Sequence, residues 1–346
     1  MPDRVTLTVN GQRYGGWTSL EVTRSLEAIA GTFTLAVTER WPEAPVRRAI
    51  HRGDRCTVAI GDDVVLTGWV DAPRRGFDAR GRTVTIRGRD ATGDLVDCSA
   101  VHTPGQWRNR RLEQIAADLC RPFGIPVRRA TDTGAPFRDV ALHTGETVFE
   151  ALERLCRHRA VLLVSDGQGG LVLTRAGTRR VSTVLAEGEN LLAAELEDSE
   201  RERYSRYVVK GQHAGDDTVG GGAAAEPQGE ARDPGVKRDR PLIVLAEDQG
   251  DAGSFRERAQ WEANVRAGRG TQGTATVQGW RDATGALWTP NTLVHVRSTT
   301  LEVDGPLLIT SVTYHLSEQG STTTLTLTRR EAFDRIPLPE ADEDLV

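Results

Sequence analysis

A glycine-rich string, Gly268-Arg269-Gly270-Thr271-Gln272-Gly273, has the GxGxxG spacing of a dinucleotide-binding loop. In a dinucleotide site this string follows a strand and opens a helix, so that the helix N-terminus faces the pyrophosphate. Here the apolar spacing predicts a helix before the string, over residues 254–267, and a strand after it. Because this order is reversed, we expect a loop that ends a helix, and no nucleotide cofactor.

The other residue types that support catalysis do not form a recognisable site. No HxH or HExxH pair that could hold a metal is present among the scattered histidines His51, His102, His143, His158, His213, His295 and His315. No GxSxG string places a serine nucleophile on a strand-to-helix turn. Some pair of acids will lie at glycosidase spacing by chance, but the sequence marks out no pair. We therefore expect no catalytic residue, no cofactor-binding residue and no metal ligand, and a protein that is not an enzyme.

The cysteines also lack the spacing of a metal or redox site. Cys56 lies at an apolar position of a predicted strand, and Cys120 and Cys156 lie near the ends of predicted helices. Together with Cys98 they contain no CxxC pair. We expect buried free thiols rather than disulfides or metal ligands.

The first part of the chain has the apolar pattern of β-strands. Val5, Leu7 and Val9 alternate with polar residues and end at Asn10-Gly11, a strong hairpin signal. Similar alternation recurs at residues 33–37, 56–60 and 84–86. Several short strands joined by turns predict a small β-barrel or sandwich over about the first ninety residues.

After about residue 100 the apolar period changes from two to 3.6 residues. Two helices are predicted, one with Leu112, Ile115, Ala116 and Leu119 on its apolar face, the other with Val148, Leu152, Leu155 and Cys156. Thr147 and Glu150 have the spacing of a capping box at the start of the second helix. A β-hairpin around residues 166–170 completes an α+β unit, and strands resume near residue 191.

The predicted fold is α+β and mostly β, with two similar small β-barrel domains, an intervening α+β domain and a helix-containing insertion. The expected boundaries are 1–97 for the first barrel, 98–180 for the α+β domain, 181–213 with 270–333 for the second barrel, 214–269 for a flexible loop and helical insertion, and 334–346 for an acidic C-terminal tail. The insertion contains a Gly/Ala-rich run at residues 220–225.

The two barrels are predicted to be copies of one module. Residues 65–70 and 83–87 form one expected strand pair, and residues 307–312 and 324–328 form another with a similar intervening loop. Each pair ends in two charged residues, Arg89-Asp90 in the first and Arg330-Glu331 in the second. Two similar modules in each chain would let a trimer present six similar units.

Charge and hydropathy exclude two classes of partner. The chain has 44 Lys and Arg against 49 Asp and Glu, a net charge of −5, whereas a general nucleic-acid binder shows a basic surplus. No apolar run is long enough to span a bilayer, and the first residues lack the layout of a signal peptide. We expect no specific nucleic-acid binding, no stable membrane insertion, and folding in a cytoplasm.

A series of short strings resembles the Mu-like contractile-tail baseplate hub family, which includes the Mu-type tail protein P and the late control protein D-like hubs. The first is TGWVD at residues 67–71, followed by a glycine-arginine-aspartate step and DLVDCSA within residues 88–100. Further matches follow in order at residues 112–124, 145–155, 207–212, 277–280, 287–291 and 325–333. The strings together span residues 67–333.

This resemblance implies a homotrimeric hub at the centre of a baseplate in the virion tail, assembled in the cytoplasm of a bacterial host. Its partners would be a central spike protein, a tail tube protein or tube-initiator, and neighbouring baseplate wedge proteins. The trimer would join the hexameric tube to the trimeric spike and form part of the DNA or cargo channel. Alternatives are the hub of a tailocin or other contractile injection system, and less readily a tail-tip cell-wall hydrolase or receptor-binding module.

Overall fold

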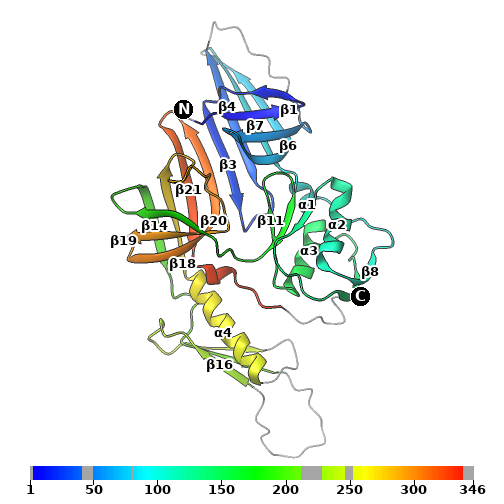
Figure 1. Cartoon of the computed structure of the whole chain (residues 1–346), viewed down its shortest axis with the longest axis vertical. Helices are drawn as coiled ribbons and strands as arrows, with labels where there is room; N and C mark the ends of the chain where they lie inside the picture. The colour runs from blue at the N-terminus through cyan, green and yellow to red at the C-terminus, as the bar shows by residue number, and fades with distance from the viewer. Residues whose placement is uncertain (1–2, 41–49, 80, 212–227, 246–251, 338–346) are drawn as a thin grey trace, which may run out of the picture.

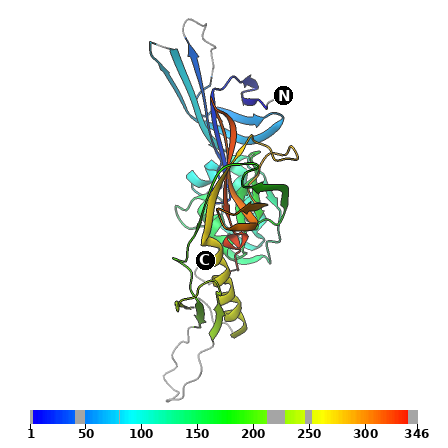
Figure 2. The ribbon, with the colours of Figure 1, turned by 90° about the vertical axis from the view of Figure 1, so that its left-hand side faces the viewer.

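The computed structural model describes residues 3–40, 50–79, 81–211, 228–245 and 252–337. Strand accounts for 49% of the structure and helix for 16%, so the chain is mostly β with few helices. A large sheet occupies one end, an α+β unit lies beside it, and a long helix projects toward the other end (Figure 1). The view from the side shows an elongated molecule (Figure 2). Within the described ranges, no helix is both long and apolar enough to cross a membrane.

The period-two pattern forms the strands of the first β region as expected. Every second residue is buried in β1 (Val5–Val9) and in β5 (Arg55–Ile60). The region also contains β2 (Gln12–Tyr14), β3 (Ser19–Ser25), β4 (Thr32–Arg40), β6 (Asp63–Phe77) and β7 (Gly81–Asp90). Asn10 and Gly11 have φ of 50° and 79° at the β1–β2 turn, the left-handed conformation that a two-residue hairpin needs.

An α+β unit follows. Its helices are α1 (Gly93–Asp97), α2 (Leu112–Cys120), the 3-10 helix η1 (Arg121–Phe123) and α3 (Val148–Arg157). Its strands are β8 (Gln106–Arg110), β9 (Val127–Arg129), β10 (Phe137–Ala141), β11 (Leu162–Ser165) and β12 (Leu171–Thr174). The predicted capping box is present, since the Thr147 hydroxyl accepts from the Glu150 amide at 3.1 Å and the Glu150 carboxylate accepts from the Thr147 amide at 2.8 Å. The apolar faces of α2 and α3 share one buried cluster with β11 and β12.

The second β region contains β13 (Arg180–Ala186), β14 (Leu191–Asp198), β18 (Thr271–Gln278), β19 (Thr292–Ser298), β20 (Val303–Ser317) and β21 (Gly320–Thr328), and the 3-10 helix η2 (Arg330–Phe333) follows it. The two strand pairs predicted as a repeat are present as the antiparallel hairpins β6–β7 and β20–β21.

A small three-stranded sheet separates β14 from β18 along the chain. β15 (Arg206–Lys210) was expected in the second barrel, but it pairs with β16 (Gln228–Arg232) and β17 (Pro241–Leu245). The reason is packing, because Tyr207 and Val209 of β15 are buried against Phe255 and Ala259 of α4 (Ala252–Arg269). The Gly/Ala-rich run at residues 220–225 and residues 338–346 of the acidic tail lie outside the described residues.

The two β regions join edge to edge in one sheet. Its strand order is β14-β18-β21-β20-β3-β4-β7-β6-β5-β1-β2, and β19 also pairs with β20 and with β13. The expectation of two closed barrels is wrong, because no ring of pairings closes among the described strands. Instead of closing onto its own region, the outer edge of β3 pairs with β20, with Leu20 opposite Leu316 and Ser25 opposite Ser311.

The same pairing order occurs twice in this sheet. The first set is β5-β6-β7-β4-β3, and the second is β19-β20-β21-β18-β14. The long strand of each set, β6 or β20, has 15 residues and a register shift near its middle. Its first half pairs with β5 or β19 on one side, and most of its length pairs with the hairpin partner on the other side. Corresponding strands also follow one another in the same order along the chain.

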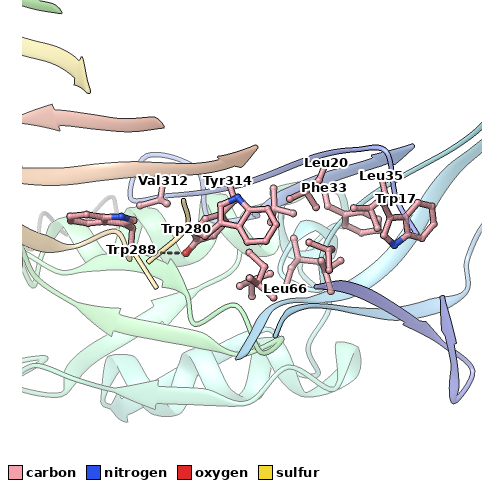
Figure 3. Packing of buried hydrophobic residues seen from close by; sticks show 14 of the residues in the cluster. Trp17, Leu20, Phe33, Leu35, Leu66, Trp280, Trp288, Val312 and Tyr314 are labelled. Carbon is pink, nitrogen blue, oxygen red and sulfur yellow. Dashed lines mark hydrogen bonds between the residues drawn. The ribbon is translucent and has the colours of Figure 1, made fainter. Parts of the chain in front are cut away.

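The shared sheet buries one continuous apolar cluster. Figure 3 shows Phe33, Leu66 and Tyr314 among its members, drawn from both β regions. The Tyr314 hydroxyl donates to the carbonyl of Trp288, and the Trp280 indole donates to the carbonyl of His315 at 2.8 Å. Trp280 and Trp288 are both buried, so the tryptophans of the second region are core residues.

Candidate assembly surfaces

The glycine-rich string of the second β region has no nucleotide-site context. α4 ends at Arg269 and β18 begins at Thr271, so the string closes a helix and opens a strand. Gly268 is needed for packing, because a Cβ at this position would lie 2.4 Å from the backbone nitrogen of Ala332. The predicted helix-ending loop is therefore confirmed.

The thiols lie in structural environments. Cys56, Cys120 and Cys156 are buried, Cys98 is half-buried, and all are free. Burial raises the pKa of Cys56 and of Cys120 to about 12, which keeps both thiols protonated at neutral pH. Over the described part of the chain, no group of three or more His, Cys, Asp and Glu side chains is placed to hold a metal ion.

Arg89 brings three of the sequence strings together. Its guanidinium donates to Asp71 at 3.0 Å and to Asp97 at 2.6 Å, so it connects the end of the TGWVD string to α1. These ion pairs are half-exposed and hold α1 against the sheet at the point where β7 ends. The spacing of the strings thus reflects one structural junction.

Asp90, the next residue, is buried and connects the sheet to the α+β unit through its side chain. Its carboxylate accepts from the Ser165 hydroxyl at 2.7 Å, and from the amide and hydroxyl of Thr92 at 3.0 Å each. The side chain is buried, and burial raises the pKa of this carboxyl above its ordinary value against the opposing effect of these donors. The junction fixes the position of β11 relative to β7.

One face of the large sheet is lined by hydroxyl groups. Residues directly opposite in antiparallel strands share a face, so the pairing register assigns each side chain to the covered face or the open face. The open face, which we call the hydroxyl face, carries Thr23, Thr32, Thr34, Thr83, Thr85, Thr274, Thr276, Ser311, Thr313, Thr322, Thr324 and Thr326. A 3.0 Å hydrogen bond between the hydroxyls of Thr23 and Thr313 crosses the junction of the two β regions on this face.

Charges on the hydroxyl face are few and of both signs. Arg74 of β6 and Arg87 and Arg89 of β7 lie on this face, as do Glu21 of β3 and Glu195 and Glu197 of β14. The opposite face of the same strands is apolar and buried, with Leu35, Ile86, Tyr314 and Leu325 in the core. The sheet is therefore covered on one side and hydrated on the other.

Two long strand edges of this sheet have no partner within the described residues. β14 ends the strand order on one side. On the other side, pairing of β6 with β5 stops at Trp69, so residues 71–77 of β6 pair only with β7. In Figure 1, β14 and β6 lie on opposite sides of the large sheet. Open edges of this length are surfaces on which another strand can pair.

Sequence reasoning predicted that strand edges pair with neighbouring subunits, but it found neither the hydroxyl face nor the strands that carry these edges. The only trace of the hydroxyl face in the sequence is the alternation of threonines in segments such as residues 322–328, and this alternation indicates strands. Such a run does not show that several strands present their hydroxyls on one continuous face, because that depends on how distant strands pair.

Comparison with known proteins finds baseplate proteins of Mu-like phages as the relatives of three successive segments of the chain. Residues 4–90 match the N-terminal domain of Mu phage baseplate assembly protein GpP-like proteins, residues 92–175 the second domain of baseplate hub protein gp44-like proteins, and residues 252–336 the fourth domain of Mu phage baseplate assembly protein GpP. The chain is 38% identical to the baseplate hub protein gp44 of Escherichia phage Mu over 342 residues, covering 96% of this chain and 89% of that protein.

Solved structures share the fold. The 43 kDa tail protein of prophage MuSo2 from Shewanella oneidensis is 37% identical and superposes with a TM-score of 0.85 over 96% of this chain and 100% of that chain. The E. coli protein c3393, a component of the type VI secretion system with structural similarity to phage T4 tail proteins gp27 and gp5, is 11% identical. It superposes with a TM-score of 0.56 over 96% of this chain and 80% of that chain, which shows a common fold.

Proposed function

This chain belongs to the Mu phage baseplate hub family of gp44-like and GpP-like proteins, and on that premise we propose that three copies form the central ring of a contractile-tail baseplate. The ring is a symmetry adaptor between a hexameric tail tube and a trimeric central spike. The observation that carries this proposal is the pairing order that occurs twice in one sheet, because three copies then present six similar modules.

The role is mechanical. One end of the ring offers the six modules to the tube protein or tube-initiator, the other end holds the spike, and wedge proteins of the baseplate contact the outside. The chain contributes part of a channel through which DNA or another cargo passes, without binding nucleic acid specifically. The net charge of −5 and the mixed charges of the hydroxyl face support a wall that does not hold a polyanion.

Three structural units serve this ring, and their limits follow the sequence boundaries with two changes. We assign residues 1–92 and 181–203 with 270–333 to the tube-facing sheet, and residues 93–180 to the α+β unit, because Leu95 of α1 is buried in the core of that unit. The insertion is extended to residues 204–269, because β15 pairs with β16 and β17.

Light scattering on the purified full-length chain, with and without its spike protein, tests this proposal. A mass of three times 37.7 kDa in either condition supports the ring. A mass of one chain across a wide range of protein concentration, with or without spike, would contradict it.

A second candidate is the hub of a tailocin or another contractile injection system, favoured by the shared fold of the type VI secretion component. Neighbouring genes distinguish the two machines, because capsid and replication genes indicate a phage. A hydrolase or receptor-binding role is tested with purified peptidoglycan and host surface glycans, and a hub should neither cleave nor bind them.

A further inference from the structure

We infer that the free edge of β6, residues 71–77, pairs with the free edge of β14 from a neighbouring copy of this chain. The inference rests on the proposed ring and names the strands that close it. It follows from the two strand sets of the large sheet, which have the same pairing order but differ at one position.

The difference lies in the second half of the long strand. In the second set, residues 311–316 of β20 pair with β3. In the first set, the corresponding half of β6 has no strand on that side among the described residues. β14 is the strand that corresponds to β3, since β14 pairs with β18 as β3 pairs with β4. Among the described residues β14 has no strand on its outer edge, so β14 of a neighbouring copy can take the place beside β6 that β3 takes beside β20.

Strand direction is consistent with this junction. Eight strands run from β14 to β6, and every neighbouring pair among them is antiparallel. An even number of alternating strands leaves β14 and β6 pointing in opposite directions. Rotation about a ring axis does not reverse a strand, so β6 of one copy meets β14 of the next in the antiparallel sense, as β20 meets β3.

The side chains of the two edges are complementary. Residues 71–77 of β6 include Arg74, while β14 carries Glu195, Glu197 and Asp198. Arg74 and Glu195 both lie on the hydroxyl face, because each is directly opposite a threonine of that face. Arg74 is opposite Thr85 of β7, and Glu195 is opposite Thr274 of β18. Opposite charges on adjacent strands stabilise antiparallel pairing.

Two exposed apolar side chains meet in the same arrangement. Phe77 is 84% exposed at the end of β6, and Leu192 is 57% exposed at the start of β14. When Arg74 lies opposite Glu195 in an antiparallel pair, Phe77 comes beside Leu192. Phe77 is three residues after Arg74, and Leu192 is three residues before Glu195 on the strand that runs the other way. Contact between copies would remove both side chains from water, which explains their exposure in the single chain.

The junction also determines which face lines the ring. One face of the sheet is covered by the buried cluster and the strands that pack on it, so this face has to lie outside. The hydroxyl face then lies inside and forms a continuous wall of threonine and serine across copies. Such a wall stays hydrated and gives a passing polyanion few cations to bind.

Cysteine pairs introduced into the full-length chain test the junction. Ala72 and Gly76 of β6, and Ala193 and Glu195 of β14, all lie on the hydroxyl face. We would make Ala72→Cys with Glu197→Cys, which is on the same face of β14, and, separately, Gly76→Cys with Ala193→Cys, because both pairs lie directly opposite each other when Arg74 is opposite Glu195. Mild oxidation with diamide should link three chains into a covalent trimer in at least one variant, because paired strands bring Cα atoms within disulfide range.

The matched control is Ala72→Cys with Val184→Cys, where Val184 lies on β13 at a different exposed edge of the sheet. It should remain monomeric on denaturing gels after oxidation. A trimer by light scattering with no covalent trimer in either test variant, or with equal linkage in the control, overturns the junction and leaves the ring intact. A chain that stays monomeric at all concentrations and with spike overturns the proposed function itself.

A charge exchange gives an independent readout. Arg74→Glu should raise the monomer fraction, and adding Glu195→Arg in the same chain should restore the trimer. If the double variant is no better than the single variant, the two side chains are not neighbours across copies.

Discussion

Asp90 and Ser165, 75 positions apart in the sequence, are joined by a 2.7 Å hydrogen bond in which the serine hydroxyl donates to the buried carboxylate. The bond connects the end of β7 to the end of β11, and so holds the α+β unit against the large sheet. Because Asp90 is only 2% exposed, the junction places an ionisable group where water cannot solvate it.

The stabilising contribution of Asp90 should therefore fall as pH rises. Burial raises the pKa of Asp90 in the folded state above its value in the unfolded chain. The contribution is complete below the unfolded pKa of about 3.9 and is lost as pH rises through the folded pKa, by at most about 1.4 kcal/mol for each pH unit. We expect the free energy of unfolding of wild type minus that of Asp90→Asn to decrease from pH 4 toward neutral, measured by urea denaturation. A difference that increases with pH would contradict this account.

Glu187 should show the opposite dependence. Its carboxylate accepts from the hydroxyls of Ser298 and Thr300 and from the amide of Thr300, and these donors lower the pKa of Glu187 from 4.5 to about 2. The stabilising contribution is present above pH 4.5 and is lost as pH falls toward 2. Thermal unfolding should show Glu187→Gln less stable than wild type at pH 6, with the difference shrinking by pH 3. An equal difference at both values would show that the carboxylate charge is not involved.

Gly88 should not tolerate a side chain. A Cβ at this position would lie 2.1 Å from the carbonyl oxygen of Trp69 and 2.5 Å from the ring of Phe33. Gly88→Ala must push apart β6 and β4, which costs about 1–3 kcal/mol in a packed core. Gly305→Ala is the matched control, since no atom lies within 4 Å of a Cβ there. We expect a clear loss of melting temperature for the first variant only, and similar values for both would disprove the steric argument.

The hydroxyl of Tyr314 should stabilise the core. Tyr314 is fully buried and its hydroxyl donates to the carbonyl of Trp288 (Figure 3). Tyr314→Phe leaves that carbonyl without this donor, at a cost of about 1–3 kcal/mol. In the control Tyr14→Phe, the lost partner is the exposed Gln12 side chain, which water can satisfy. Urea denaturation should separate the two variants, and equal stabilities would show that the buried bond contributes nothing net.

Local patterns in the sequence predicted local structure well. The alternation of Val5, Leu7 and Val9 is fixed by the two-residue period of a strand, and the capping box of Thr147 and Glu150 needs only four consecutive residues. Both are present in the structure. The repeat was also visible, because similar strands leave similar spacing.

Long-range pairing was not predictable in this way. The hydrogen bond between Thr23 and Thr313 joins residues 290 positions apart, and neither residue carries a local sign of the other. The sequence therefore indicated two barrels where the strands form one open sheet. Tyr207 and Val209 have an ordinary strand pattern, and only their burial under α4 assigns β15 to the small sheet. The hydroxyl face depends on the same distant pairings, so single strands do not reveal it.

Two truncations of the C-terminal segment distinguish a role in the stability of the hub from a role in docking the spike. The Arg335 guanidinium donates to the carbonyl of Val161 at 3.2 Å and lies 3.5 Å from the Glu153 carboxylate of α3. Removing residues 335–346 deletes these contacts, whereas removing residues 338–346 keeps them. We expect only the longer truncation to lower the melting temperature.

The shorter truncation then tests docking in a hub that is otherwise unchanged. If the acidic residues of the tail contact the spike, removal of residues 338–346 should weaken co-purification of spike with hub, because four carboxylates are lost from Glu340, Asp342, Glu343 and Asp344. The effect should be larger at low salt, where charge attraction is less screened. Co-purification that is unchanged at low salt would remove the tail from the spike interface and leave Arg335 as part of the hub itself.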